Sequence, residues 1–167
     1  YLTKLQEADP TNGRANVALG EYNLRTKNWD QAFTYFEKGF EDPEIEIDIK
    51  MNFVIQIQES EKVTDDRLDT LIAIILKIHP REAKAYTLAA DQAIYDEQFE
   101  LAKDLFNTAL KFEKKIFAIW QQTYMMMYEL NDIQGLYTVT KECSEYFPTN
   151  ATVFYFNAIA AIAPPKN

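Results

Sequence analysis

The two side chains best suited to chemistry are the only histidine, His79, and the only cysteine, Cys143. A general base needs a partner within hydrogen-bond reach and a metal site needs several ligands, but these two residues are far apart in the sequence. His79 precedes Pro80 at a predicted helix end, where a cation interacts favourably with the helix dipole. Cys143 occupies a small-residue packing position, which favours a buried, inert thiol over a nucleophile. Neither residue is therefore expected to be catalytic or to bind a metal.

Two clusters of similar side chains also have simple structural interpretations. The acidic run in residues 41–48 lacks the glycine turn of a calcium loop, so a solvated loop explains it. The consecutive Met125, Met126 and Met127 point in three directions on a helix, so at most one or two can face a binding surface. No glycine-rich phosphate loop, nucleophile elbow or zinc-binding pair occurs. The sequence therefore predicts no enzyme and no cofactor.

Composition and charge limit the class of protein. The chain has 167 residues, 47% of them apolar, which is enough to bury the core of one domain. A formal charge of −9 and a pI near 4.7 oppose binding to phosphate backbones, so nucleic acid is not expected as a partner. The sequence has no run of about 18 apolar residues, the length needed to cross a bilayer, which predicts a soluble protein without direct membrane insertion. A single cysteine leaves the compartment, cytoplasmic or periplasmic, open.

Prolines divide the chain at a nearly constant interval. The separations are 33 residues from Pro10 to Pro43, 37 from Pro43 to Pro80, and 68, or two units of 34, from Pro80 to Pro148. A period of about 34 residues is typical of helical repeats. Four glycines and few alternating β-branched runs leave little room for strands. The sequence therefore predicts an all-α fold in which each unit is a pair of antiparallel helices.

The predicted division has an incomplete unit at each end. Residues 1–10 are the tail of a preceding repeat, residues 11–43, 44–80, 81–114 and 115–148 are four repeats, and residues 149–163 form a terminal helix. Because the first residues look like the back half of a helix and no initiator methionine is present, we expect an excerpt of a longer protein. A targeting segment could have been removed with the missing part.

Capping residues mark several predicted helix starts. Asn12 and Asn28 can cap the two helices of the first repeat, Asn150 can cap the terminal helix, and Thr64 with the two aspartates after it begins another. Residues 44–58 alternate polar and apolar side chains as a strand would. A lone strand would leave its backbone groups unpaired, so we predict a helix there. Its buried face would consist of Ile45, Ile49, Phe53 and Ile57.

Two stretches share one spacing pattern of large and small side chains. The same spacing occurs in both stretches: the first has Trp29, Ala32, Phe36, Gly39 and Phe40, and the second has Phe99, Ala102, Phe106, Ala109 and Leu110 at the corresponding positions. With Leu19, Gly20, Tyr86, Trp120 and Ile133 added, the chain resembles the tetratricopeptide repeat (TPR) family over nearly its whole length. Thr140 departs from the aromatic pattern. The resemblance implies a right-handed superhelical solenoid that binds a protein or peptide in a concave groove lined by the first helix of each pair.

When the groove positions of the family are transferred to this sequence, the predicted surface is mixed. It is charged in the N-terminal repeat and more apolar and aromatic in the later repeats. Such a lining would suit an extended or helical peptide with an apolar anchor. The predicted groove residues are Arg14, Val17, Glu21, Arg25, Phe53, Ile57, Lys84, Thr87, Asp91, Tyr95, Gln121, Met125, Tyr128 and Tyr155.

One subclass of the family grips the C-terminal carboxylate of heat-shock chaperones with lysine, asparagine and arginine side chains. At the matching positions this sequence has Val17, Glu21, Val54 and Leu88, and only Lys84 remains. One cation cannot replace a clamp whose energy comes from several charge-assisted hydrogen bonds. This sequence is therefore not expected to bind that ligand.

Three functions follow from this reading. The first is a non-enzymatic interaction scaffold. The second is a structural spacer or self-association module, because the terminal helix is apolar nearly all round and an uncapped end of a repeat array is adhesive. Its contact residues would be Phe154, Phe156, Ile159 and Ile162. The third is a regulatory part of a larger enzyme or assembly, for which no motif occurs here.

Overall fold

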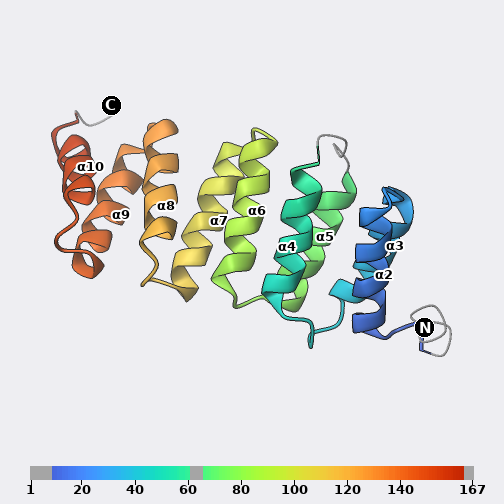
Figure 1. The fold of residues 1–167 in the computed structure, drawn as a ribbon. Helices are drawn as coiled ribbons and strands as arrows, with labels where there is room; N and C mark the ends of the chain where they lie inside the picture. The colour runs from blue at the N-terminus through green and yellow to red at the C-terminus, as the bar shows by residue number, and fades with distance from the viewer. Residues whose placement is uncertain (1–8, 61–65, 164–167) are drawn as a thin grey trace. The chain divides into compact units, whose positions relative to one another are not determined.

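The computed structural model describes residues 9–60 and 66–163. All regular secondary structure in these residues is helical, which confirms the predicted all-α fold (Figure 1). The chain divides into two compact units, Tyr1–Arg81 and Glu82–Asn167. Unit 1 contains α2 (Gly13–Arg25), α3 (Trp29–Phe40), α4 (Ile47–Gln58) and α5 (Asp66–Ile78). Unit 2 contains α6 (Ala83–Tyr95), α7 (Phe99–Phe112), α8 (Phe117–Glu129), α9 (Ile133–Tyr146) and α10 (Ala151–Ile162).

The capping predictions hold at two of the three described positions. Asn12 accepts a hydrogen bond from the Ala15 backbone amide at 2.9 Å, and Asn150 accepts one from the Thr152 amide at 3.0 Å. Asn28 does occupy the N-cap position of α3, but its side chain makes no capping hydrogen bond, so that prediction was wrong. Thr64 and Asp65 lie outside the described residues.

The turn inside three of the helix pairs has one repeated geometry. Lys27, Glu97 and Asn131 have φ values of 60°, 58° and 54°, in the left-handed region. The residue after each of them donates its amide to the carbonyl five positions earlier, at 2.8, 2.7 and 2.9 Å. This is the Schellman motif, which pairs the carbonyls left open at a helix C-terminus. The motif turns the chain back and brings the second helix antiparallel to the first.

A small side chain on the first helix faces a large one on the second. A Cβ atom added at Gly20 would lie 2.6 Å from the Phe36 ring, so only glycine allows α2 and α3 to approach this closely. At the equivalent positions of unit 2, α6 and α7 carry Ala90 and Phe106, both fully buried. In the next pair the order of sizes is reversed, since α8 carries Tyr124 and α9 carries Thr140, again fully buried. The reversal explains why Thr140 can depart from the aromatic pattern without opening a cavity.

Most of the ambiguous stretch in residues 44–58 forms a helix, as predicted, but the helix begins only at Ile47 and its buried face is not the predicted one. Ile45, Phe53 and Ile57 are buried, whereas Ile49 is 42% exposed. Fully buried instead is Lys50. Its Nζ donates to the carbonyl oxygens of Phe40 at 2.7 Å and Asp42 at 2.9 Å. An ion from α4 thus occupies the C-terminus of α3, where the helix dipole favours positive charge.

His79 lies beside this lysine. Its Nε2 is 3.0 Å from Lys50 Nζ, which makes the imidazole an acceptor when the lysine is charged. His79 therefore lies next to the lysine whose Nζ binds the carbonyl of Phe40 at the C-terminus of α3. Desolvation by burial lowers the pKa of Lys50 to about 8, and the Asp42 carboxylate opposes that shift.

Candidate peptide-binding surface

In unit 1, a cavity of about 400 Å³ lies between α2 and α4. Four of the predicted groove residues line it: Arg14, Val17, Glu21 and Phe53. Val17 and Phe53 are each 8% exposed and form an apolar floor, with the longer polar side chains at its edge. The structure therefore brings the first helices of the first two predicted repeats together around one concave site.

The same cavity has lining residues that the sequence reading missed. Glu44, Ile45 and Glu46 reach it from the loop before α4, and Ile49 reaches it from the helix. The spacing of Ile49, four residues from its apolar neighbours, predicts a core position, but the side chain is 42% exposed and lines the cavity. The lining contains three glutamates and one arginine, so it carries a net negative charge.

Two further predicted groove residues of unit 1 lie elsewhere. Arg25 forms an exposed ion pair with Glu21, with 2.6 Å between Nη2 and Oε1, and it does not line the cavity. Ile57 is fully buried. Its inclusion in a surface was wrong, because the side chain packs into the core and has no area left for a partner.

In unit 2, the predicted residues of α6 lie along one helix. Tyr95 is 71% exposed at its end, and Thr87 Oγ1 donates to the Lys84 carbonyl at 3.0 Å. Asp91 accepts a hydrogen bond from Gln122 Nε2 at 3.3 Å, which joins α6 to α8. Desolvation raises the pKa of the Asp91 carboxyl above its usual value. Gln122 is thus part of this surface, although the sequence pattern predicted only its neighbour Gln121 there.

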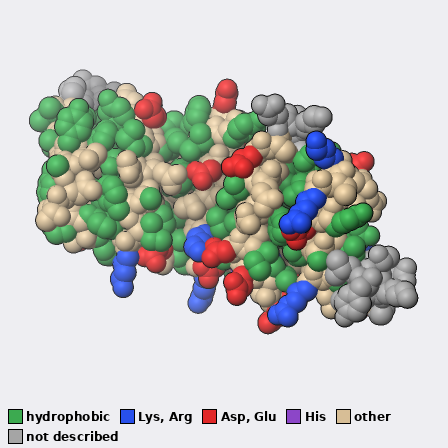
Figure 2. Space-filling view, in the orientation of Figure 1, with side chains coloured by type: hydrophobic (Ala, Val, Ile, Leu, Met, Phe, Trp, Pro, Cys, Tyr) green, Lys and Arg blue, Asp and Glu red, His purple; other side chains and the backbone are tan. Residues whose placement is uncertain are grey.

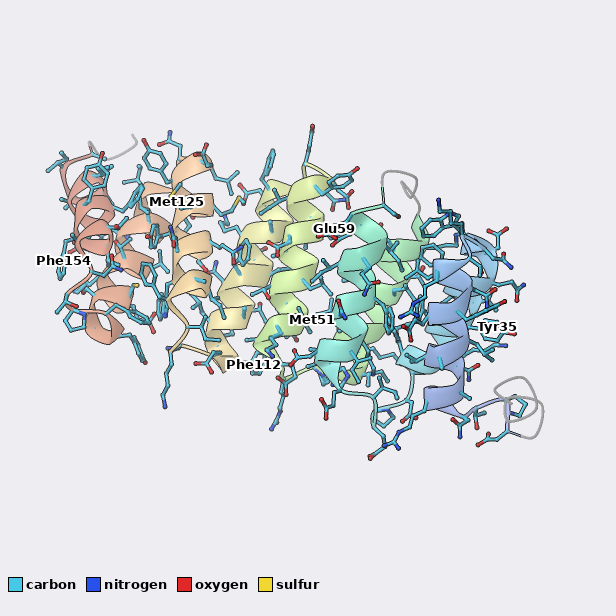
Figure 3. All side chains as sticks on the ribbon, viewed as in Figure 1. Tyr35, Met51, Glu59, Phe112, Met125 and Phe154 are labelled. Atoms are coloured by element: carbon cyan, nitrogen blue, oxygen red, sulfur yellow. The ribbon has the colours of Figure 1, made fainter. Side chains whose placement is uncertain are left out.

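The predicted residues of α8 and α10 include a cluster of exposed aromatic rings. Tyr128 and Tyr155 are 43% and 63% exposed, and each ring lies 5.3 Å from the Phe156 ring in an edge-to-face arrangement. Gln121 and Met125 are also exposed on α8, and Met125 extends from the helix in Figure 3. Rigid, half-exposed aromatic side chains of this kind are common in protein-binding surfaces.

Three side chains that could have been reactive or adaptable have structural roles. Met126 and Met127 are buried at 8% and 6% exposure, so only Met125 of the three methionines faces outward, as predicted. Cys143 is fully buried. Desolvation and the neighbouring Glu142 raise the pKa of the Cys143 thiol to about 11, which keeps it protonated and unreactive.

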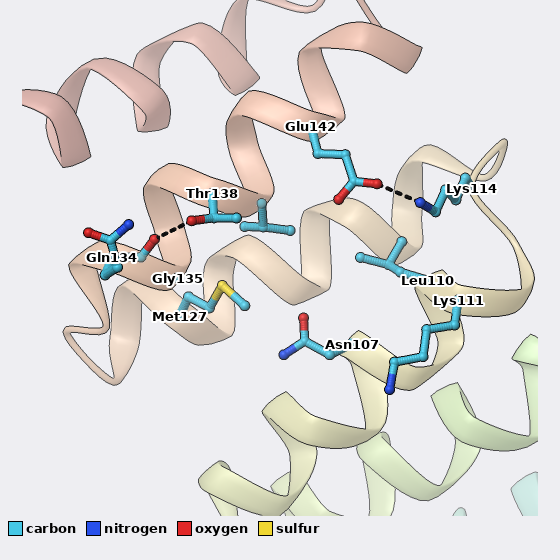
Figure 4. Close-up of a pocket in the computed structure, with 10 residues that line it drawn as sticks. Asn107, Leu110, Lys111, Lys114, Met127, Gln134, Gly135, Thr138 and Glu142 are labelled. Atoms are coloured by element: carbon cyan, nitrogen blue, oxygen red, sulfur yellow. Dashed lines mark hydrogen bonds and ion pairs between the residues drawn. The ribbon is translucent and has the colours of Figure 1, made fainter.

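A second cavity, of about 640 Å³, lies on α7, α8 and α9 in unit 2 (Figure 4). It contains none of the predicted groove residues, and most of its lining comes from the second helices of their pairs. Leu110, Met127 and Val139 supply its apolar lining. Sequence reasoning missed it, because these residues belong to the regular packing stripes and nothing in their spacing marks a gap between helices.

Neither a metal-binding cluster nor a membrane-spanning helix occurs in the part of the chain that the structure describes. No three His, Cys, Asp or Glu residues there are placed so that they could hold a metal ion. None of the helices in residues 9–60 and 66–163 is long and apolar enough to cross a membrane.

Comparisons with known proteins show the kind of fold. No protein-family model matches the sequence, and no curated protein matches it. Among solved structures, MamA aligns with a TM-score of 0.59 at 9% identity, covering 89% of this chain and 80% of MamA. A MamA point mutant aligns with a TM-score of 0.55 at 16% identity, covering 89% of this chain and 85% of that one. Yeast Tom70 aligns at 0.44 with 15% identity, over 97% of this chain and 42% of Tom70. MamA is a helical repeat protein of the tetratricopeptide type, so the fold of this chain is TPR-like.

Proposed function

We propose that this chain is a non-enzymatic interaction module that binds a peptide segment or a folded partner through its first helices. The TPR-like fold supports a protein partner, since neighbours of this fold are typically scaffolds. In this proposal the predicted repeats end at residues 43 and 80 in unit 1 and at residues 114 and 148 in unit 2, and the first helix of each repeat supplies the binding face of its unit. Catalysis has no support in the arrangement of the described side chains.

The observation that carries the proposal is the exposed aromatic face of unit 2. Tyr128 and Tyr155 expose large, rigid rings that are already held in place by Phe156. Such rings lose little conformational entropy on binding, so they give more affinity per residue than flexible side chains. A peptide with an apolar or aromatic anchor is the ligand that this face would bind best.

The binding prediction can be tested without knowing the natural partner. A peptide that binds the native domain is first selected from a random display library, and its Kd is then measured by fluorescence anisotropy. Replacing Tyr128 by alanine is expected to weaken binding by about 2 kcal/mol, roughly thirtyfold, because a central aromatic contact is lost.

Tyr137→Ala is the matched control. Tyr137 has a similar exposure of 37% but lies on α9, a second helix. We expect the control to bind the peptide as the native domain does. Equal losses in both variants, or none in either, would contradict a binding site on the first helices.

A second candidate function is self-association through α10. Phe154 and Ile162 are 49% and 83% exposed, and Figure 2 shows apolar side chains gathered at the end of unit 2 that carries α10. The other two predicted contact residues, Phe156 and Ile159, are already partly buried within the domain and have less exposed surface to offer. Phe156 already packs against Tyr124 with ring centroids 5.1 Å apart, so Phe154 and Ile162 would make most of the contact.

Light scattering tests this candidate. The native domain is expected to form a dimer at high concentration, and Phe154→Glu is expected to weaken the dimer at least about tenfold, because a charge would be buried in the contact. Leu101→Glu is the control, since Leu101 is 48% exposed on α7. A native domain that stays monomeric, or variants that behave alike, would exclude self-association through α10.

A further inference from the structure

We propose that the cavity on α7, α8 and α9 is a second binding site, which takes an extended acidic peptide with apolar side chains between its carboxylates. This site is separate from the proposed surface of the first helices and does not depend on it. Leu110, Met127 and Val139, each 6% exposed, form the apolar floor. The volume of about 640 Å³ is within the range of pockets that hold small ligands and short peptide segments.

Two side-chain amides border this floor. Asn107 reaches it from α7 and Gln134 from α9, as Figure 4 shows. Neither side-chain amide makes a hydrogen bond within the part of the chain that the structure describes. Each amide offers both a donor and an acceptor, which matches the alternating amide and carbonyl groups of a peptide backbone. Their position therefore favours a backbone ligand in extended conformation over an apolar small molecule.

The charge at the edge of the cavity favours an acidic ligand. Lys114 Nζ is 2.5 Å from Glu142 Oε1 and so already has an anionic partner. Lys111, which lines the same cavity and is exposed, forms no ion pair with any described residue. It is thus the cation available to a bound carboxylate. The chain as a whole carries a charge of −9, so a preference for an acidic peptide would be specific to this site.

An extended peptide fits this arrangement because its successive side chains point to opposite sides. An apolar side chain would lie on the floor, and the carboxylates on either side of it would lie toward the lysine at the edge. The amides would bind the backbone between them. A helix would leave its backbone groups paired internally and would make no use of the two amides.

The four methionines provide a test in which each region reports separately. Methyl-labelled methionine gives one NMR signal each from Met51 in α4, Met125 on the first-helix surface, Met126 in the core and Met127 in the cavity. The probe is a capped hexapeptide of alternating leucine and aspartate. We expect it to shift the Met127 signal and to leave the Met51 and Met125 signals in place. The matched peptide with lysine in place of aspartate should not shift Met127.

A charge reversal tests the role of the lysine. Lys111→Glu is expected to weaken the aspartate peptide about fivefold or more, whereas Lys115→Glu, which changes the net charge equally but lies outside the cavity, should not. Circular dichroism checks that both variants are folded. Equal binding of the two peptides, no Met127 shift at millimolar peptide, or equal effects of the two variants would overturn the proposal. A Met127 shift on dilution without peptide would assign the cavity to a second copy of the chain and would overturn it as well.

Discussion

Replacing Trp120 by alanine is expected to lower the free energy of unfolding by about 3–5 kcal/mol, the largest loss that we predict for any single side chain here. Trp120 is fully buried in the core cluster of unit 2. Its ring lies 5.5 Å from the Tyr146 ring, and its Nε1 donates to the Lys114 carbonyl at 2.8 Å. Alanine would remove both contacts and leave a cavity that helices α8 and α9 could fill only in part.

Trp120→Phe separates the hydrogen bond from the packing. Phenylalanine keeps most of the apolar volume but cannot donate, so we expect a loss of about 1–3 kcal/mol from the unpaired Lys114 carbonyl and the smaller ring. Urea unfolding followed by circular dichroism at 222 nm gives both values. If Trp120→Ala lowers the free energy of unfolding no more than Trp120→Phe does, the packing of the Trp120 ring does not stabilise unit 2 in the way that the structure indicates.

The helices could be predicted from the sequence because their signals are local. The 34-residue spacing, the capping asparagines and the small and large stripes each depend on residues within one helix or its neighbour. Even in the strand-like residues 44–58 the sequence predicts a helix, because a helical array offers no partner strand, and residues 47–58 form one. The fold class and most of the core therefore follow from the order of residues alone.

The turns and the cavities could not be predicted in the same way. Lys27, Glu97 and Asn131 adopt the left-handed conformation without the glycine that usually marks it. Ile49 is exposed and Lys50 is buried, and the carbonyls of Phe40 and Asp42 that accept hydrogen bonds from Lys50 lie outside the sequence of α4. The cavity near Lys111 exists only because three helices meet there. Such features depend on tertiary packing, and short-range patterns do not determine it.

Replacing Lys50 by methionine is expected to cost about 2–4 kcal/mol of unfolding free energy at neutral pH. Methionine has a similar shape, so little cavity results. The carbonyls of Phe40 and Asp42, however, would lose donors at 2.7 and 2.9 Å in a site closed to water. Lys77→Met is the control, because the Lys77 side chain is 72% exposed, and we expect it to change stability by less than about 0.5 kcal/mol.

The cost of Lys50→Met should also depend on pH. The pKa of Lys50 falls from 10.5 to about 8 on folding, mainly through desolvation by burial. Between these values the unfolded chain holds a proton that the folded chain has released, so by linkage the native stability rises with pH across this window. The unfavourable contribution of the buried charge is fully present below pH 8 and is gone above pH 10.5.

The methionine variant lacks this titration. The difference in stability between native and variant should therefore grow from pH 8 to pH 10. Urea midpoints at pH 7, 8, 9 and 10 would measure it, with Lys77→Met run in parallel. A difference that stays constant over this range would mean that the Lys50 ammonium is solvated, and a buried ion could then not be what holds the C-terminus of α3 against α4.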